Sequence, residues 1–193
     1  MSAFGLGGYA NVTEVEVELF TASYRVAGTI HTPFRRVAEL LNQLPGVHLA
    51  VEGATIVEHG AEVVDRAATA LVTVDEVLVL VAPGLVGESS AEMRILKHPA
   101  HAILWVPPLR LDGTIHVPVG IHPADGLLNV PDRFLPMTDA SVTSAAYPAL
   151  DRIFPILALR RDRAHVIVVS EPGESADGDE DPQDGIPSSE EAS

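Results

Sequence analysis

Internal repetition is the feature of this 193-residue chain that most restricts its fold. The segment Val26–Pro33, which reads VAGTIHTP, returns about 85 positions later as LDGTIHVP in Leu111–Pro118. Self-similarity at one spacing predicts two copies of one small structural unit. Three more blocks recur in the same order: Leu40–Asn42 with Leu127–Asn129, His48–Ile56 with Phe134–Val142, and Val77–Leu80 with Val166–Val169.

The first copy has the pattern of a β-rich unit with one short helix. Val15, Val17 and Leu19 alternate with glutamates, which is the period of a half-buried strand. A second strand passes through the GTIH block and stops at Pro33. The apolar spacing within residues 35–44 predicts a short helix. Further strands are predicted at 47–51, 54–58, 70–74 and 77–82, with a tight bend at 74–77.

The second copy repeats this order, with a shorter helix near Pro123 and an enlarged last turn at residues 160–163. The predicted fold class is therefore mainly β with short helices (α+β), as two tandem small domains that are bent sheets or barrel-like. Two such units are expected to pack through a shared sheet edge or a common apolar face, because each alone is small for independent stability. The predicted segments are a flexible N-terminus at 1–11, repeat domains at 12–83 and 101–171, a linker at 84–100 with a short helix within Glu88–Lys97, and a disordered acidic tail at 172–193.

Composition restricts both the compartment and the chemistry. The chain has no cysteine, which excludes disulfides, thiolate metal sites and a cysteine nucleophile. Its first residues have neither the basic nor the apolar region of a signal peptide. The most apolar stretch, Val77–Val86, is about half the length of a bilayer span and is interrupted by Pro83-Gly84. We expect a cytoplasmic protein with no membrane insertion. The scarcity of lysine is typical of GC-rich bacterial genomes.

The charge balance argues against nucleic acid as a partner. The net charge is −15, and the segment Pro172–Ser193 holds eight acidic residues and no basic one. Proteins that bind nucleic acid draw much of their affinity from Lys and Arg on phosphates. Here the only lysine is Lys97, and the arginines are mostly scattered.

The ordered blocks of the second copy resemble an uncharacterised family of small bacterial domains. The residues that carry this resemblance are Gly113–Pro118 (G-x-x-H-x-P), Leu127–Asn129 (L-L-N) and Pro136–Ala140, which contains T-D-A. The first copy departs from the pattern, because Val51–Ala54 stands where the Thr-Asp-Ala block is expected. The strand order also resembles Sm-like small barrels, although those have their helix at the N-terminus. Neither resemblance implies an activity.

Histidines are the first candidate site residues. His31 and His116 occupy equivalent strand ends, where they either meet as ligands between the copies or bond to nearby loop groups. His98, His101 and His122 extend this set, with Asp125 as an oxygen donor. Pro99 interrupts the spacing and no zinc signature is matched, so we predict no metal site and no cofactor.

Two further groups are candidate binding residues. Thr138 and Asp139 are predicted to stabilise a turn through side-chain bonds to the backbone. Arg160, Arg161 and Arg163 form the basic element predicted to be most exposed, suited to an acidic surface such as the chain's own tail.

No catalytic residues are predicted, because the sequence has no nucleophile elbow, no P-loop and no carboxylate pair in an apolar setting. The hypothesis from sequence is a non-catalytic protein-interaction or scaffold module. The alternative is a small-ligand or metal-binding regulator that uses His116, His122 and the Asp139 loop. An enzyme would need His31 and His116 to converge with carboxylates. The sequence leaves open whether the protein forms a homo-oligomer.

Overall fold

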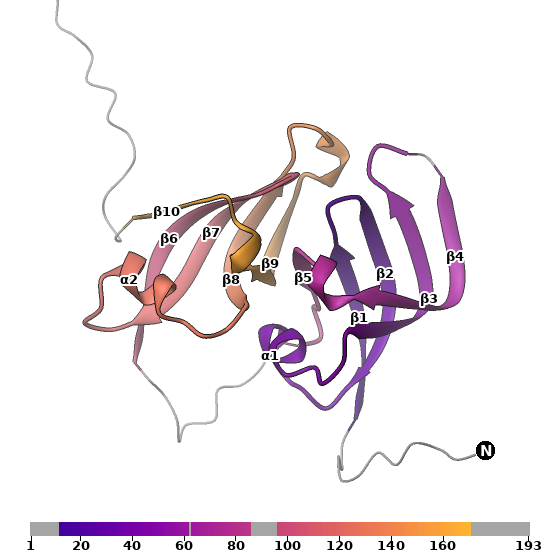
Figure 1. The fold of residues 1–193 in the computed structure, drawn as a ribbon, viewed down its shortest axis with the longest axis horizontal. Coiled ribbons are helices and arrows are strands. Elements are labelled where there is room, and N and C mark those ends of the chain that lie inside the picture. The colour runs from indigo at the N-terminus through magenta and orange to yellow at the C-terminus, as the bar shows by residue number, and fades with distance from the viewer. Residues whose placement is uncertain (1–11, 62, 86–95, 171–193) are drawn as a thin grey trace, which may run out of the picture.

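The computed structural model describes residues 12–61, 63–85 and 96–170. The chain is mainly β with short helices, as predicted, and the ten described strands form one open antiparallel sheet (Figure 1). We call residues 12–85 the first half and residues 96–170 the second half. The predicted flexible N-terminus, tail and most of the predicted linker helix lie outside the described residues.

Both halves have the same order of strands and α-helices, and the second half has one additional 3-10 helix, η3. The first half consists of β1 (Thr13–Phe20), β2 (Tyr24–Thr32), α1 (Val37–Asn42), β3 (His48–Glu58), β4 (Val64–Thr73), the 3-10 helix η1 (Val74–Glu76) and β5 (Val79–Val81). The second half consists of β6 (Lys97–Val106), β7 (Leu109–Pro118), α2 (Pro123–Leu128), β8 (Phe134–Thr143), the 3-10 helix η3 (Pro148–Leu150), β9 (Arg152–Arg160), the 3-10 helix η4 (Arg161–Arg163) and β10 (Val166–Ser170).

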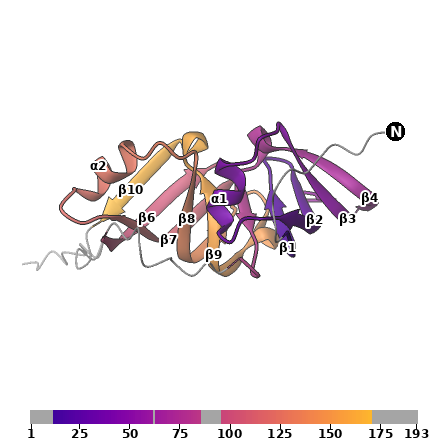
Figure 2. The same ribbon diagram turned by 90° about the horizontal axis from the view of Figure 1, so that it is seen from below.

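The strands of each half are also ordered alike in space. The sheet runs β10-β6-β7-β8-β9-β5-β1-β2-β3-β4, so each half contributes its fifth strand, then its first to fourth strands. The two halves meet where β5 pairs with β9. A shared sheet edge is thus one of the two packing modes expected from sequence. Figure 2 shows the sheet bending along its length, with α1 near the middle and α2 toward the β10 end.

Three predicted boundaries differ from the structure. The strands expected at 47–51 and 54–58 are one strand, β3, and the strand expected at 70–74 begins earlier as β4. The second half begins with a strand at Lys97, four residues before the predicted boundary at His101. Pro99 lies within this strand, where alternating residues are buried against the core, so the segment 97–100 belongs to the sheet and not to a linker.

A glycine and a bulge explain the G-T-I-H block in each half. Gly28 in β2 and Gly113 in β7 lie where the register with the next strand shifts. A Cβ at Gly28 would lie 2.5 Å from the Glu52 carbonyl oxygen, and one at Gly113 would lie 2.9 Å from that of Thr138. The partner strand has one extra residue at these points, and only glycine allows the two backbones to approach so closely.

The bulge also corrects the prediction for Thr138 and Asp139. The sequence predicts a turn held by side-chain bonds to the backbone, but both residues lie within β8, and the Thr138 hydroxyl donates to the Thr114 carbonyl oxygen of the neighbouring strand at 3.5 Å. Asp139 has a φ of 50°, and Gly53 at the same place in β3 has a φ of 57°. The left-handed backbone of a bulge favours Gly, Asn and Asp, the same residue types that mark turns. The residue types at 138–139 therefore indicate an irregular backbone correctly, but that irregularity is a bulge within a strand and not a turn.

Candidate functional site at the joint between the halves

The joint is the β5–β9 strand pair, and the side chains of its four paired residues are completely buried. Val79 lies opposite Leu159 and Leu80 lies opposite Ala158, and all four are 0% exposed. The two apolar cores interlock here, because Phe134 of the second half belongs to the core of the first. Side chains buried from both halves exclude water from the joint, so hydrophobic burial holds the halves together.

Helix α1 covers the joint and bonds across it. The Asn42 side-chain amide donates to the Phe134 carbonyl oxygen at 2.8 Å, and the Phe134 N–H donates to the Asn42 Oδ1 at 2.9 Å. The helix packs against β8 and β9. The repeated L-L-N block thus has different uses, because the Asn129 side chain bonds locally to the Asp125 carbonyl oxygen at 2.8 Å.

A loop contact closes one end of the joint. The buried His59 ring lies 5.4 Å from the Tyr147 ring, and its Nε2 is 3.1 Å from the Thr21 carbonyl oxygen. Gly60, with a φ of 80°, brings its backbone so near that a Cβ there would lie 3.2 Å from the Tyr147 ring. The loop after β3 is therefore held against the loop after β8.

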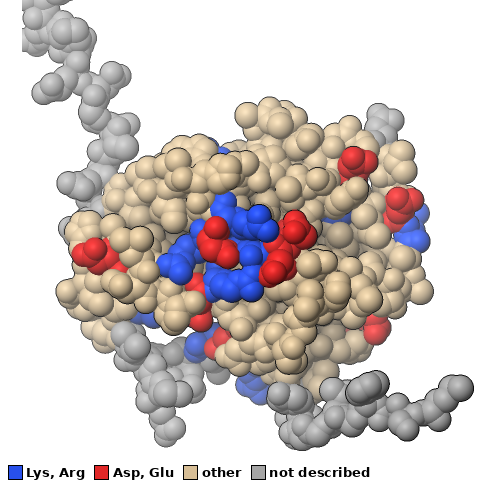
Figure 3. All heavy atoms as spheres, viewed as in Figure 1, with Lys and Arg blue, Asp and Glu red and all other residues tan. Residues whose placement is uncertain are grey.

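A cluster of charged side chains crosses one face of the joint, and Figure 3 shows it at the centre of the molecule. Its central residue is Arg160, whose side chain is only 5% exposed. The Arg160 Nε donates to Asp162 at 2.7 Å, and its Nη1 donates to the carbonyl oxygens of Val74, at 3.3 Å, and Asp75 in the other half. A guanidinium can satisfy several oxygens at once, so this one side chain connects η1 to β9.

The surrounding charges reinforce this link. Arg133 bonds to the Asp75 carboxylate, and Arg163 donates to the Asp75 carbonyl oxygen at 3.1 Å. The Arg133 hydrogen bond is the main reason why the pKa of Asp75 lies below its ordinary value of 3.8. The hydrogen bond from Arg160 likewise lowers the pKa of Asp162. Both carboxylates are therefore held in the charged form that the arginines stabilise.

The prediction that residues 160–163 form the most exposed basic element is wrong for Arg160, which is buried. Arg161 donates to the Leu127 carbonyl oxygen at the end of α2, and Arg163 bonds across the joint. The sequence placed these arginines beside an enlarged turn, but it did not reveal that η1 of the other half lies against them. Their described contacts stabilise the fold, and the tail lies outside the described residues.

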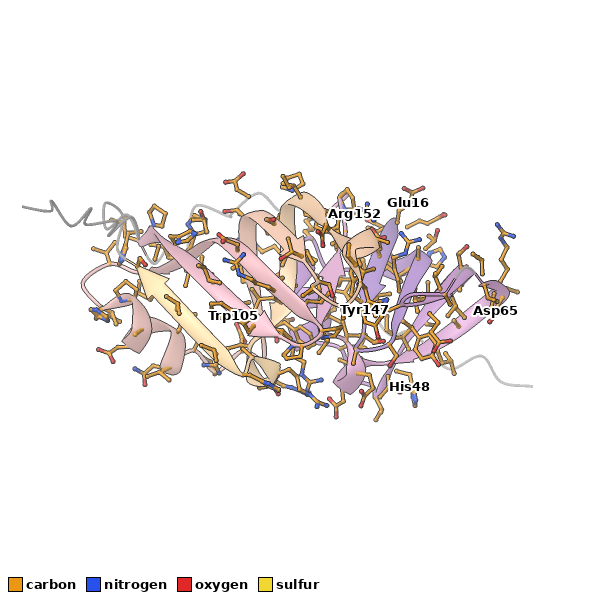
Figure 4. The ribbon with its side chains drawn as sticks, turned by 90° about the horizontal axis from the view of Figure 1, so that it is seen from above. Glu16, His48, Asp65, Trp105, Tyr147 and Arg152 are labelled. Carbon is orange, nitrogen blue, oxygen red and sulfur yellow. The ribbon has the colours of Figure 1, made fainter. Side chains whose placement is uncertain are left out.

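An open cleft of about 570 Å³ lies at the joint. Figure 4 shows Glu16 and Arg152, two of its residues, on the side of the sheet opposite His48. Apolar side chains and two glycines make up much of its wall, and charged side chains lie among them. The cleft is lined by Glu16, Val17, Glu18, Arg25, Ala27, Gly28, Thr29, Gly53, Thr55, Val81, Pro83, Arg152, Phe154, Pro155 and Ile156.

Glu18 organises the charges of this cleft. Its carboxylate lies 2.9 Å from the Arg25 guanidinium in the same half, and Arg152 from the second half approaches both of its oxygens at 2.6 and 2.8 Å. Arg152 also lies over the Phe154 ring, 4.9 Å from its centroid. Two carboxylates and two guanidiniums balance in the cleft, so it has no net charge.

Sequence reasoning missed every residue of this cleft. Glu16 and Glu18 are the glutamates that alternate with the apolar residues of the predicted half-buried strand, and nothing in the sequence connects them to Arg152. The connection depends on β5 pairing with β9, which brings residues 134 positions apart into contact. The glycine of the GTIH block was the one available signal, since Gly28 lies in the cleft wall.

The histidines predicted as candidates do not meet. Four strands of the sheet lie between His31 in β2 and His116 in β7. Each has a local neighbour, because the His31 Nε2 is 3.4 Å from a Glu52 oxygen and the His116 Nε2 is 3.4 Å from the Thr138 hydroxyl. The enzymatic hypothesis required His31 and His116 to converge, and in the structure they do not.

His122 and His101 also have local partners. His122 caps α2, because its Nδ1 accepts from the Ala124 N–H at 3.3 Å, and the His101 Nε2 lies 2.7 Å from Asp112. In the described part of the chain, no three histidine or carboxylate side chains lie close enough together to hold a metal ion.

The cleft residues are suited to binding. Its polar groups are carboxylates, guanidiniums and threonine hydroxyls, and the pairing of Glu18 with both arginines keeps them in fixed positions. Within the described residues, no helix is long and apolar enough to cross a membrane. Comparisons with protein-family models, curated proteins and solved structures found no match to the chain.

Proposed function

We propose that this chain is a non-catalytic protein-interaction module that binds an extended segment of a partner protein in the joint cleft. The observation that carries the proposal is an open, mostly apolar cleft whose charges balance within it. Binding sites are commonly concave and apolar with a few placed polar groups, and they occur where two units meet. An extended, uncharged, apolar peptide matches this lining.

The cleft residues favour binding over catalysis. A general base or nucleophile needs a partner that activates it, as a histidine activates a serine. The cleft lining contains no histidine, serine or lysine, and Glu18 is bonded to two guanidiniums. Nucleic acid is a poor fit as well, because each guanidinium in the cleft already faces a carboxylate and would have to leave it to reach a phosphate.

The setting of this module is part of the proposal. We place it in the cytoplasm of a bacterium, because the chain lacks cysteine and has the composition of a GC-rich genome. The equal order of strands and α-helices in the two halves supports their origin by duplication of one small domain. Only the joint between them creates the cleft, so duplication would have supplied the binding site.

A small uncharged molecule is the second candidate occupant. The volume of about 570 Å³ is within the range of small-molecule sites. The ligand-binding hypothesis from sequence used His116, His122 and Asp139, but none of these residues lines the cleft. The small-molecule site proposed here is therefore a different one.

Peptide display on the intact chain tests the proposal. Thr55 lines the cleft, and Ser141 has the same place in the second half, opposite Asp112 as Thr55 is opposite Ala27. We expect selected peptides to be apolar and uncharged, and to lose binding to Thr55→Trp while retaining it for Ser141→Trp. Peptides that bind Thr55→Trp as well as the unchanged chain would refute the site. Stabilisation by a metabolite but by no peptide, again lost in Thr55→Trp, would favour the second candidate.

A further inference from the structure

The β5–β9 joint is a head-to-tail contact between two units of the same topology. It joins the fifth strand of the first half to the fourth strand of the second half. The two ends of the sheet are then β10, a fifth strand, and β4, a fourth strand. One chain therefore presents, at its two ends, the same kinds of strand edge that pair at its centre.

The register of the inner strands identifies the equivalent residues on the free fifth strand. Leu80 in β5 lies opposite Leu19, and Ile167 in β10 lies opposite Leu104 at the same position in the second half. Leu80 pairs with Ala158 across the joint. Ile167 is therefore the residue of the free edge that corresponds to Leu80. The alignment of Val77–Leu80 with Val166–Val169 predicted from sequence is thus wrong by two residues, because both blocks are short apolar runs that align almost equally well in either register.

The fourth strands correspond in the same way. Ala158 in β9 lies opposite Pro136, and Leu71 in β4 lies opposite Ala50 at the same position of β3. A joint repeated between two chains would thus place Ile167 of one chain opposite Leu71 of the other.

Burial distinguishes the joined edge from the free edges. Leu80 and Ala158 are 0% exposed, whereas Ile167 is 37% exposed and Leu71 is 67% exposed. Val166 and Val168 beside Ile167 are also exposed. An exposed apolar edge strand with unpaired backbone groups is a template for pairing with another chain.

We propose that a second copy of this chain docks head to tail on these edges, with β10 of one chain pairing antiparallel to β4 of the next in the register of β5 and β9. This assembly uses the sheet edges and not the joint cleft, so it is independent of the proposed function. Continuity with the joint selects a second copy as the occupant, because that strand pair is already stable within the chain.

Helix α2 supports the same occupant. At the joint, α1 extends over β8 and β9 of the other half. Helix α2 follows β7 as α1 follows β2 and contacts β10, and its Leu128 is 75% exposed, whereas Leu41 of the corresponding L-L-N block in α1 is buried. In the repeated joint, α2 would extend over β3 and β4 of the next chain and cover this leucine.

The charges near the edges are compatible with this contact. At the joint, Arg152 in β9 meets Glu18, which is bonded to Arg25. Asp65 in β4 has the place of Arg152, and Arg110 in β7 has the place of Arg25. Ile103 has the place of Glu18, so the carboxylate that the repeated joint brings in, Asp65, approaches Arg110, which is bonded to Asp112 at 3.0 Å within its own chain. Figure 4 shows Asp65 at the β4 end of the molecule.

A head-to-tail contact repeats until the rotation between chains closes a ring, or it continues as a filament. Mass measurement by light scattering and native mass spectrometry tests the first consequence. We expect the full chain to form species heavier than its 20.4 kDa, as one closed ring or a concentration-dependent series. A monomer at every concentration tested would overturn the proposal.

Two edge variants test the direction of the contact. Ile167→Lys disables the β10 edge and Leu71→Lys disables the β4 edge, so each variant alone is expected to be a monomer. Their mixture retains one intact edge of each kind and is expected to form a 1:1 heterodimer. Ile153→Lys is the control, because Ile153 is 79% exposed on β9, inside the sheet, and this variant is expected to assemble like the unchanged chain.

Register is tested by Ile167→Lys combined with Leu71→Glu in one chain. A lysine directly opposite a glutamate restores an attractive cross-strand pair, so assembly is expected to return. A single variant that still dimerises would indicate pairing of like edges and would overturn the head-to-tail contact. Assembly that is unchanged in both variants would place the interface elsewhere and would overturn it too.

Discussion

Leu80 and Ile167 occupy the same position in the two halves of the chain, opposite equivalent leucines of the neighbouring strand, yet only Leu80 is fully buried. The difference comes from the next strand, since β5 has β9 beside it and β10 has no further strand of the described chain. The comparison teaches that position within the unit determines the strand, while position in the whole sheet determines burial. The paired edges of β5 and β9 are part of the core, and the unpaired edges of β10 and β4 are part of the surface.

The first way to test this comparison is to truncate both residues. We expect Leu80→Ala to lower the free energy of unfolding by about 2–5 kcal/mol, because it leaves a cavity in a fully buried joint. Ile167→Ala is expected to cost less than about 1 kcal/mol in the monomer, as is usual for an exposed site. Urea denaturation of both in a Leu71→Lys background removes the effect of assembly on stability. Equal losses would contradict the burial difference between the edges.

The two bulges provide the second test. Gly28→Ala and Gly113→Ala each push a Cβ into a facing backbone, at 2.5 and 2.9 Å from a carbonyl oxygen. We expect each to cost about 1–3 kcal/mol, with the larger loss at Gly28 because the contact is closer. Thermal denaturation of the two variants measures the order. A smaller loss at Gly28 than at Gly113 would mean that the β3 bulge yields more readily than the β8 bulge.

The arginine cluster gives the third test. Arg160→Met removes hydrogen bonds to Asp162 and to two carbonyl oxygens of the other half. A loss of about 2 kcal/mol is expected from charge-assisted bonds of a buried group. Arg163→Met is the matched change on a half-exposed side chain, and its expected cost is below about 1 kcal/mol. Chemical denaturation separates the two variants, and an equal effect would contradict the central role of Arg160.

The positive-φ residues give a smaller test with opposite signs in the two halves. Asp139→Gly relieves a side chain from a left-handed backbone and is expected to stabilise by about 0.5–1 kcal/mol. Gly53→Ala imposes that strain at the equivalent position and is expected to destabilise by about 1 kcal/mol. Backbone strain is its whole cost, because no atom lies within 4 Å of the new Cβ and no steric clash is added. Melting temperatures of the two variants show whether the signs differ.

Acid is expected to weaken the arginine cluster at the joint. Asp75 and Asp162 have lowered pKa values in the folded chain, so their ion pairs stabilise it above the ordinary pKa of 3.8. This contribution is lost as the pH falls through the lowered pKa values. We expect the stability difference between the unchanged chain and Asp75→Asn with Asp162→Asn to stay constant well above pH 3.8 and to shrink as the pH falls through and below 3.8. Urea denaturation at several pH values measures it, and a difference that stays constant below pH 3.8 would contradict the assignment.

Much of the local structure was predictable from residues close together in the sequence. Alternation at Val15, Val17 and Leu19 predicted β1, and the apolar spacing before Pro45 predicted the helix α1. Thr138 and Asp139 show the limit of such signals, because the same residue preference marks turns and bulges. What distinguishes a bulge from a turn here is Gly113, which faces these residues from the neighbouring strand β7.

The candidate site was beyond sequence reasoning because its parts come from distant segments. Glu18 and Arg152 have no shared motif, and each by itself is an ordinary surface charge. Arg160 was predicted to be exposed because a run of charges at a turn usually faces water. Its burial depends on η1 of the other half, which supplies the oxygens that make a buried guanidinium tolerable.

The sequence by itself determined the β-rich class, the repeated blocks and most strand positions, because these depend on side-chain periodicity and turn residues within a few positions. The tertiary structure alone decided that β5 pairs with β9, and with it the buried joint, the arginine cluster and the cleft. Strand pairing is made by backbone groups that every residue has, so local sequence does not specify the partner. That choice depends on which apolar faces become buried together when the chain folds.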